Sequence, residues 1–242
     1  MKILHLSDLH LTSASFSKKL WENLLDLAHQ KIKPNIVIIS GDIVENGYIS
    51  EYKVAKKLID QIKIPKFIVP GNHDVCNEGD VLFEKFFGSR FFEFDEKKVS
   101  ILGVDSTQPD LEDGNVGREG HQKIKNFFQK RQNKIKILVL HHHLIPIPGT
   151  GRERSIPWDA GDLLKLLFDL NVNIVLSGHR HKFWVWKLEK TFFITSSTPT
   201  TFYLRGFDEP SCNLLEIKEK KFILKRVFSA QKKIKKILEK SL

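Results

Sequence analysis

The sequence is poor in cysteine and contains no long apolar run. Its two cysteines, Cys76 and Cys212, form no disulfide framework pattern, so a reducing compartment is the simpler interpretation. No apolar run approaches the ~20 residues that a membrane-spanning helix needs, and the first residues are too few and too polar for a secretory signal. From these absences we expect a cytoplasmic protein. An internal repeat and a low-complexity linker are also lacking, which favours one domain for most of the 242 residues.

Positive charge is abundant, but it is concentrated at one end of the chain. Residues 218–242 contain ten Lys or Arg against two Glu, a net charge of +8, which leaves only +2 of the total +10 for the rest. Charge confined to one end indicates an appendage that touches something anionic rather than a basic face built into the fold. We therefore expect a domain over residues 1–229 and a basic amphipathic tail over residues 230–242.

The tail is predicted to be a helix from residue 231 onward. Its apolar face would consist of Ile234, Ile237, Leu238 and Leu242. Such a helix could dock on its own domain, lie on anionic lipid at a membrane surface, or remain a solvated coil. We favour docking on its own domain or disorder over membrane contact.

Five short runs rich in Ile, Val and Leu predict buried strands. They cover residues 2–6, 35–39, 66–69, 135–140 and 173–176. Continuous apolar runs are typical of strands that are covered on both faces. Amphipathic stretches that predict helices cover residues 16–31, 50–62, 120–130 and 160–170. This alternation of strand and helix is an α/β pattern.

The segments after Gly178 are shorter and richer in aromatic and β-branched residues. They cover residues 183–188, 191–195, 200–204, 213–217 and 222–228. Hairpins in a second sheet fit such segments best. The predicted fold class is therefore α/β, a two-sheet sandwich flanked by helices.

A polar cluster follows each of the five predicted buried strands. The clusters are Ser7-Asp8-Leu9-His10, Gly41-Asp42, Gly71-Asn72-His73-Asp74, His141-His142-His143 and Gly178-His179-Arg180-His181. Because the carboxyl ends of parallel strands lie along one edge of a sheet, we expect these clusters to converge on one crevice. In extended backbone, residues two apart point the same way, so Asp8 with His10, and His179 with His181, would each approach it from one side. Glycines 41, 71 and 178 would permit sharp turns and close backbone approach.

The side chains in these clusters form a set of metal ligands without thiolates. Two or three carboxylates, at least four imidazoles and one amide oxygen suit Mn, Fe or Zn better than Ca. Seven ligands are too many for one tetrahedral ion and fit two ions that share a carboxylate. The sequence therefore predicts a site for two divalent metal ions.

The series Asp-x-His, Gly-Asp, Gly-Asn-His-Asp, an isolated His cluster and Gly-His-x-His resembles the calcineurin-like metallophosphoesterases. The match extends from Asp8 to His181, and its strength lies in five weak motifs that occur in order at strand ends. The segment of residues 102–107, Leu-Gly-Val-Asp-Ser-Thr, followed by Gly117 and Gln122, is similar to the branch that contains cyclic-nucleotide phosphodiesterases.

This resemblance implies a role for each residue of the cluster. The first metal would be held by Asp8, His10, Asp42 and His181. The second would be held by Asp42, Asn72, His141 and His179. Asp42 would bridge the ions, and His142 is an alternative to His141. His73 would approach the scissile phosphate as a general acid or as a hydrogen-bond donor to its oxygens. A water bridging the two ions, with its pKa lowered toward neutrality, would supply the hydroxide that attacks phosphorus.

The long loop over residues 144–158 is expected to form a lid beside the site. Four arginines are weaker candidates for binding substrate phosphate: Arg152, Arg154, Arg180 and Arg205. Asp74 would either orient His73 or cap the turn that follows it. We assign no functional role to His5, His29 or His121.

These observations favour a phosphodiesterase or phosphomonoesterase that acts on a small molecule, such as a cyclic nucleotide. Nucleic acid is an unlikely partner because the main body of the chain is nearly neutral. The alternatives are a nuclease, a lipid-linked pyrophosphate hydrolase that uses the basic tail, and a non-catalytic scaffold of the same fold. The sequence leaves the oligomeric state open.

Overall fold

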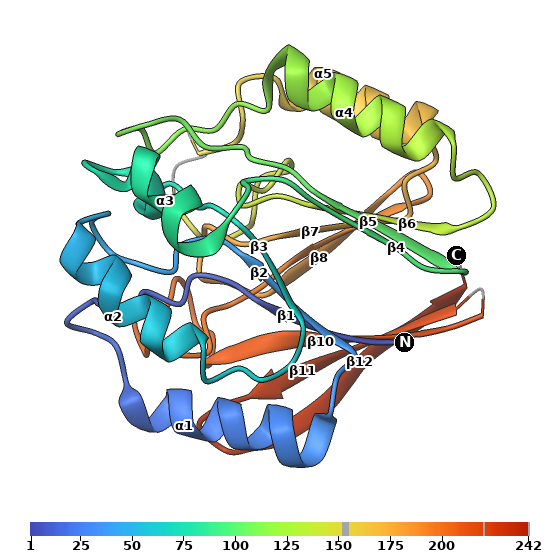
Figure 1. Ribbon diagram of the computed structural model, residues 1–242. Helices are drawn as coiled ribbons and strands as arrows, with labels where there is room; N and C mark the ends of the chain where they lie inside the picture. Colours follow the sequence, from blue (N-terminus) through green and yellow to red (C-terminus); the bar gives the residue numbers. More distant parts are fainter. Residues whose placement is uncertain (152–154, 220, 242) are drawn as a thin grey trace.

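Two six-stranded sheets pack face to face in the computed structural model, which describes residues 1–151, 155–219 and 221–241 (Figure 1). The first sheet has the order β12-β11-β10-β1-β2-β3, and the second has the order β4-β5-β6-β7-β9-β8. The first sheet consists of β1 (Lys2–Leu6), β2 (Ile36–Ser40), β3 (Lys66–Val69), β10 (Ser211–Lys218), β11 (Lys221–Phe228) and β12 (Lys233–Ser241). The second consists of β4 (Phe92–Asp95), β5 (Val99–Gly103), β6 (Ile135–Val139), β7 (Ile174–Ser177), β8 (Trp184–Leu188) and β9 (Thr191–Thr195).

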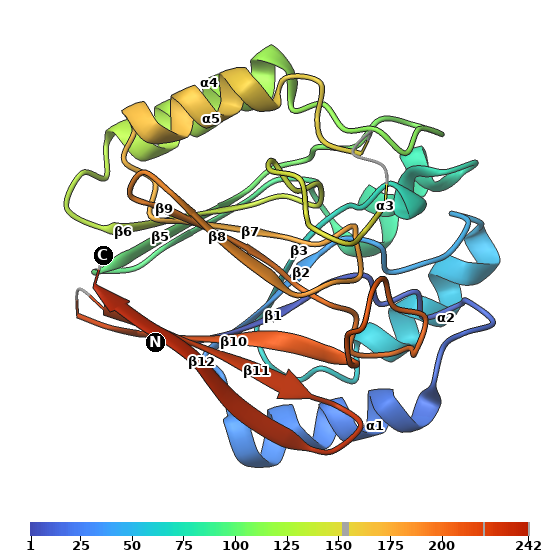
Figure 2. The same ribbon diagram turned by 180° about the vertical axis from the view of Figure 1, so that it is seen from behind.

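Helices cover the outer face of each sheet (Figures 1 and 2). The helices on the first sheet are α1 (Lys18–Asp26), which continues as the π-helical turn η1 (Leu27–Ile32), α2 (Ile49–Ile59) and α3 (Gly79–Phe87). Those on the second sheet are α4 (Gly117–Gln129) and α5 (Ala160–Asp169). A short 3-10 turn, η2 (His73–Val75), follows β3. The predicted α/β sandwich flanked by helices is confirmed.

Three apolar layers hold this arrangement together. Ile38 of β2 and Ile137 of β6 belong to the layer between the sheets, whereas Val37 packs outward under α1 and α2, and Leu138 packs outward under α4 and α5. Neighbouring residues of one strand thus enter different layers because side chains alternate across a sheet. This explains why the buried strands read as continuous apolar runs: both of their faces are covered.

The parallel strands of the two sheets bring their carboxyl ends to the same end of the molecule. β1, β2 and β3 run parallel in the first sheet, and β5, β6, β7 and β9 run parallel in the second. The two chain termini lie at the opposite end (Figure 1). Loops that follow β1, β2, β3, β6 and β7 therefore share one edge of the sandwich.

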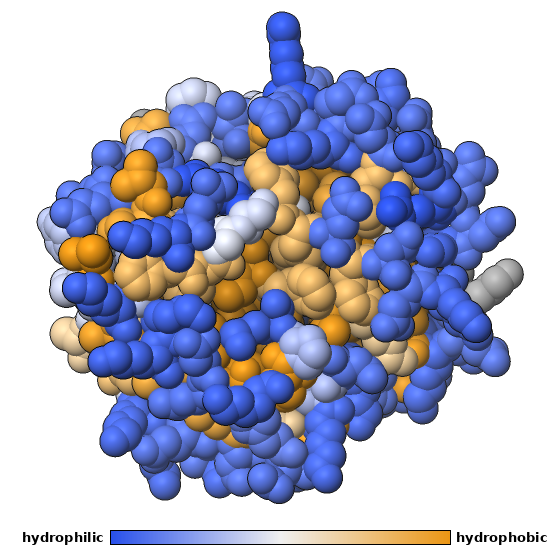
Figure 3. Space-filling model, viewed as in Figure 1, coloured by the Kyte–Doolittle hydropathy of each residue, from blue (hydrophilic) through white to orange (hydrophobic). Residues whose placement is uncertain are grey.

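Aromatic residues close the gap between the sheets where the edge strands β3 and β4 approach each other. Figure 3, in the same view as Figure 1, shows apolar residues gathered in the middle of the face toward the viewer. The ring centroid of Phe67 lies 5.2 Å from that of Phe92 and 5.4 Å from that of Phe94. The adjoining hollow of about 300 Å³ is also lined by Phe86 and Phe87 of α3. Helix α3 and strand β4 were absent from the sequence prediction.

The helix predicted for the end of the chain is wrong, because residues 233–241 form strand β12. This strand pairs antiparallel with β11, and the register shifts between Leu224 and Lys225. Ile234 packs into the layer under α1, whereas Ile237 and Leu238 pack into the layer between the sheets. Pairing with β11 and contact with both layers thus outweigh the helical spacing of these residues. The division of the chain at residues 229 and 230 stays a prediction.

The strand assignments after Gly178 need two further corrections. Residues 200–204 form no strand. The remaining segments do not share one second sheet: β8 and β9 join the second sheet, whereas β10 pairs antiparallel with β1 and extends the first.

Among the described residues, no helix combines the length and the apolar character that crossing a bilayer requires.

Candidate metal centre

Asp8, His10, Asp42 and His181 bring four ligand atoms together beyond the ends of β1, β2 and β7. Nε2 of His10 lies 3.0 Å from Nε2 of His181 and 3.7 Å from Oδ2 of Asp42. Nε2 of His181 lies 3.5 Å from Oδ1 of Asp8. All four side chains are nearly or fully buried. Ligands of one ion at about 2.1 Å are roughly 3 to 3.5 Å apart, so this spacing fits a metal ion.

A second group of ligand atoms lies directly beside the first. Nε2 of His141 lies 3.3 Å from Oδ2 of Asp42, 3.0 Å from Oδ1 of Asn72 and 3.1 Å from Nδ1 of His179. Nδ1 of His179 lies 2.9 Å from the same Asn72 oxygen. The Oδ2 atom of Asp42 therefore contacts imidazoles of both groups, as a carboxylate shared between two ions would.

The tautomers of the imidazoles leave lone pairs facing each other inside these groups. Nδ1 of His141 lies 2.7 Å from the carbonyl oxygen of Ser40, and Nδ1 of His181 lies 3.2 Å from that of Tyr203. A carbonyl oxygen only accepts hydrogen bonds, so in the neutral rings Nδ1 carries the proton and Nε2 presents a lone pair to the cluster. Converging lone pairs and carboxylate oxygens in a buried site repel one another unless a cation lies between them. The residues present therefore fit two metal ions.

Left-handed backbone conformations orient these side chains. The φ angles of Asp8, His10, Asp42, His179 and His181 are 53°, 40°, 54°, 73° and 49°. The expectation that the two pairs spaced two apart lie in extended backbone is therefore wrong. Left-handed conformations at residues other than glycine cost of order 1–3 kcal/mol each and persist only where the surroundings impose them. The backbone hydrogen bonds from Asp8 N to Gly41 O and from His10 N to Asp42 O do so here.

Glycine is required at position 41 for the same close packing. Its φ is +90°, and a Cβ there would lie 2.7 Å from Nδ1 of His141. The predicted need for a glycine that allows close backbone approach is borne out at this position.

Electrostatic contacts within the cluster shift the ionisation of its members. Burial opposes ionisation of Asp42, but the neighbouring imidazoles of His141 and His73 hold its pKa well below the usual value. Burial likewise lowers the pKa of His141, yet the Asp42 carboxylate outweighs it and raises that pKa to about 9. The site thus keeps its shared carboxylate ionised, as metal binding requires.

His142 lies behind the cluster and uses both of its ring nitrogens elsewhere. Its Nδ1 is 2.9 Å from Oγ of Ser106, and its Nε2 is 3.1 Å from the carbonyl oxygen of Glu112. Burial, followed by the charge of His141, lowers the pKa of His142 to about 3. Of the two candidates in the His run, His141 is the one whose free nitrogen enters the ligand group.

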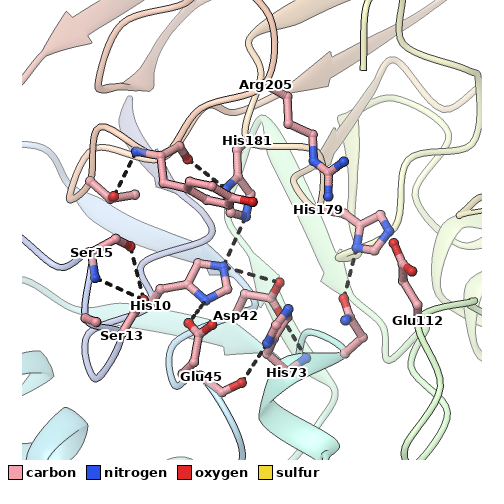
Figure 4. Close-up of a pocket in the computed structure, with 14 residues that line it drawn as sticks. His10, Ser13, Ser15, Asp42, Glu45, His73, Glu112, His179, His181 and Arg205 are labelled. Atoms are coloured by element: carbon pink, nitrogen blue, oxygen red, sulfur yellow. Dashed lines mark hydrogen bonds and ion pairs between the residues drawn. The ribbon is translucent and has the colours of Figure 1, made fainter. Parts of the chain in front are cut away.

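His73 and Asp74 occupy different environments in the turn after β3. The backbone N–H of His73 donates to Oδ1 of Asp42 at 3.0 Å. The ring of His73 lines the cavity beside the two groups of ligand atoms (Figure 4). Asp74 is fully buried and accepts backbone hydrogen bonds from Ile43, Val44 and Gly71 at 2.8 to 3.0 Å. Asp74 therefore joins the loop after β2 to the turn after β3. Within the described residues, no hydrogen bond connects its carboxylate to the ring of His73 or to the turn that follows it.

The decisive comparison is with protein families. A sequence model of the calcineurin-like phosphoesterases matches residues 1–183, three quarters of the chain. The chain belongs to this family. The match covers the loops after β1, β2, β3, β6 and β7, and it confirms the resemblance predicted from the five motifs.

Sequence relatives agree with this membership in the calcineurin-like phosphoesterase family, and a solved structure shares the fold. A probable cyclic nucleotide phosphodiesterase of Ruthia magnifica is 27% identical over 159 residues, which cover 62% of this chain and 64% of the relative. A probable glycerophosphodiester phosphodiesterase of Arcobacter nitrofigilis is 26% identical over 226 residues, which cover 83% of this chain and 79% of the relative. A purple acid phosphatase from yellow lupin seeds matches the whole chain with a TM-score of 0.79 and 16% identity, over 53% of its own length. The chain thus spans about half of the lupin protein, and the likeness concerns the fold.

A cavity of about 440 Å³ lies over the two groups of ligand atoms in this protein (Figure 4). Its lining includes His10, Asp42, Asn72, His73, His179 and His181. It also includes seven residues that the sequence analysis missed: Ser13, Ala14, Ser15, Glu45, Glu112, Thr201 and Tyr203. The missed residues lie in loops, where neither apolar periodicity nor a family motif marks them. For one of them, Glu45, the sequence does contain a signal, since this carboxylate follows Asp42 by three residues and so falls in the same loop.

The four candidate arginines have different positions. Arg205 lines the cavity and extends toward His179 (Figure 4). The guanidinium of Arg180 is buried and donates to the Thr150 carbonyl and to Oγ of Ser155, so it holds the loop after β6. Arg152 and Arg154, together with the centre of the predicted lid, lie outside the described residues.

Proposed function

We propose that this protein hydrolyses phosphate esters with two divalent metal ions, and that phosphodiesters are its substrates. The observation that carries the proposal is the position of Asp42 Oδ2, which contacts the imidazoles of two ligand groups beside the cavity. The carboxylate, imidazole and amide donors suit Mn, Fe or Zn. When bound, two such ions supply Lewis acidity toward phosphoryl oxygens and a nucleophile at neutral pH.

The side chains of the site divide the remaining tasks. The carboxylates of Asp8 and Asp42, with Asn72 and the imidazoles of His10, His141, His179 and His181, would hold the metals. His73, whose backbone is fixed by Asp42, would donate a hydrogen bond or a proton through its ring. Arg205 would neutralise charge on the phosphoryl group from the opposite wall of the cavity. Catalysis of phosphoryl transfer consists mostly of such positioning and charge neutralisation, and it needs no protein nucleophile.

The cavity also favours a phosphodiester that carries a planar group, such as a cyclic nucleotide. The side chain of Tyr203 lines the cavity and is 70% exposed, and its ring centroid lies 6.3 Å from that of the predicted ligand His181. An exposed aromatic ring at this distance offers a stacking surface for a nucleobase. The relatives are named for a cyclic nucleotide and for a glycerophosphodiester, which supports a diester as substrate.

Metal-dependent hydrolysis of a chromogenic phosphodiester is the direct test of this proposal. Chelated enzyme is expected to be inactive, and addition of Mn, Fe or Zn is expected to restore turnover, because the metals would supply the Lewis acidity and the nucleophile. The matching monoester, assayed in parallel, gives the preference between diester and monoester. Absence of turnover with every metal, in a folded protein that binds metal, would contradict the proposed activity and favour a scaffold.

Replacement of Tyr203 by alanine should raise the KM for 3′,5′-cyclic AMP about tenfold. Stacking of a base on an aromatic side chain contributes roughly 1–3 kcal/mol, and each 1.36 kcal/mol is a factor of ten. Hydrolysis of glycerophosphocholine, which has no planar group, should change less than about twofold. The carbonyl of residue 203 that contacts His181 is retained in the variant.

Two variants serve as controls for this prediction. Tyr203→Phe keeps the ring and should keep the wild-type KM. Phe207→Ala removes a fully exposed aromatic side chain of the same loop that does not line the cavity. An equal loss for both substrates in Tyr203→Ala would mean that the ring does not recognise a planar group.

A further inference from the structure

Glu45 contacts two imidazoles of the site at the same time. Its Oε2 atom lies 2.9 Å from Nδ1 of His10, and its carbonyl oxygen lies 2.6 Å from Nδ1 of His73 (Figure 4). The two rings meet edge to face with centroids 4.8 Å apart. One residue of the loop after β2 therefore touches both a predicted metal ligand and the predicted proton donor.

The backbone of Glu45 is itself fixed by a chain of hydrogen bonds. Its N–H donates to Oγ1 of Thr12 at 3.1 Å, and the Thr12 hydroxyl donates to Oε1 of Glu51 at 3.2 Å. Glu51, in the first turn of α2, also accepts from the backbone N–H groups of Asn46 and Tyr48, which precede the helix. The position of Glu45 is thus tied to the start of α2.

We propose that Glu45 is a positioning residue: its carboxylate fixes the tautomer and ring orientation of His10, so that Nε2 is the nitrogen presented to metal. The inference rests on the proposed metal-dependent function. A carboxylate oxygen 2.9 Å from Nδ1 favours the proton on that nitrogen by its charge, and this leaves the lone pair at Nε2. Carboxylates that hold metal-binding histidines in this way typically raise metal affinity 10- to 100-fold.

Glu45 contacts His73 through its backbone carbonyl oxygen, so it also orients the ring of His73. A carbonyl oxygen at Nδ1 leaves Nε2 as the nitrogen that a substrate can meet. Substitution of the Glu45 side chain leaves this carbonyl in place, so the backbone contact with His73 is retained in side-chain variants.

Metal titration of the chelated full-length protein tests the inference without depending on turnover. Calorimetry with Mn²⁺ and with Zn²⁺ should show at least about tenfold weaker binding at one of two sites in Glu45→Ala. Glu45→Gln should lie between this variant and the wild type, since its amide oxygen still accepts from Nδ1 but carries no charge. Nitrogen-15 NMR of metal-free protein should show His10 protonated at Nδ1 in the wild type and as a tautomer mixture in Glu45→Ala.

Glu112 provides the matched control, because its carboxylate also lines the cavity but no contact in the described residues joins it to a ligand imidazole. Glu112→Ala should bind both metals within about twofold of the wild type. Wild-type affinity in Glu45→Ala, or an equal loss in Glu45→Ala and Glu112→Ala, would overturn the positioning role alone. A wild-type protein that binds neither metal would overturn the proposed function and this inference with it.

Discussion

Replacement of Asp42 by asparagine is expected to lower the rate of phosphodiester hydrolysis by at least about 100-fold. The Oδ2 atom of Asp42 lies near the imidazoles of His10 and His141, and Oδ1 accepts from the backbone of His73. An amide of the same shape offers one oxygen and a donor NH₂ group, so it loses both the charge and the second acceptor. Losing metal stabilisation of the transition state costs several kcal/mol, and each 1.36 kcal/mol is a factor of ten.

The measurement is kcat/KM for a chromogenic diester together with the number of bound metal ions per chain. Asp42→Asn should lose metal as well as rate, while far-ultraviolet circular dichroism remains that of the wild type. Asp60→Asn is the control, since Asp60 directly follows α2 and its exposed carboxylate pairs with Lys56 at the surface. If Asp42→Asn kept a rate within about threefold of the wild type, the shared-carboxylate assignment would be wrong.

The strands of the site could be predicted from the sequence because their burial produces continuous apolar runs. β1 and β3 occupy the predicted residues, β6 ends one residue earlier than predicted, and β2 and β7 are each shifted by one residue toward the carboxyl end of the chain. Each is covered on both faces, and this condition produces an apolar run that can be recognised without a structure. The position of a polar cluster after each run follows from the same property, since the apolar requirement ends where the strand leaves the core.

The conformation of those clusters could not be predicted from the same pattern. The left-handed backbone at His10 and His179 is imposed by hydrogen bonds that their N–H groups donate to partners distant in sequence. His10 N donates to the carbonyl oxygen of Asp42, and His179 N donates to the carboxylate of Asp8 at 2.9 Å. Local spacing contains no information on such partners. The preference for His141 over His142 rested on the end of the strand alone, and local spacing contained nothing about Ser106, 36 positions from His142, which contacts that second ring.

The error at the end of the chain shows how tertiary pairing overrides local spacing. Ile234, Ile237 and Leu238 are spaced as on one face of a helix, and the surrounding lysines fit its solvent side. Strand β11 nevertheless offers unpaired backbone groups along its whole length, and β12 satisfies them in an antiparallel ladder. The lysines then lie along an exposed edge strand, where positive charge discourages pairing with further chains.

Replacement of His73 by asparagine should lower kcat by about 100-fold or more while the metal content stays at the wild-type level. General acid–base catalysis by one side chain contributes roughly 10²- to 10⁴-fold. The backbone N–H that donates to Asp42 is retained in the variant, so the shared carboxylate keeps its support. His121→Asn is the control: this imidazole pairs with Asp159 at the start of α5, outside the cavity.

The dependence on the leaving group separates the two roles open to His73. A general acid matters most for an alkoxide leaving group and little for a nitrophenolate, which departs without a proton. The loss in His73→Asn should therefore be larger for glycerophosphocholine than for the chromogenic diester if His73 is the acid. An equal loss for both substrates would instead assign it to hydrogen bonding with the phosphoryl oxygens. Wild-type rates on both substrates would remove His73 from the catalytic machinery and leave its ring as a wall of the cavity.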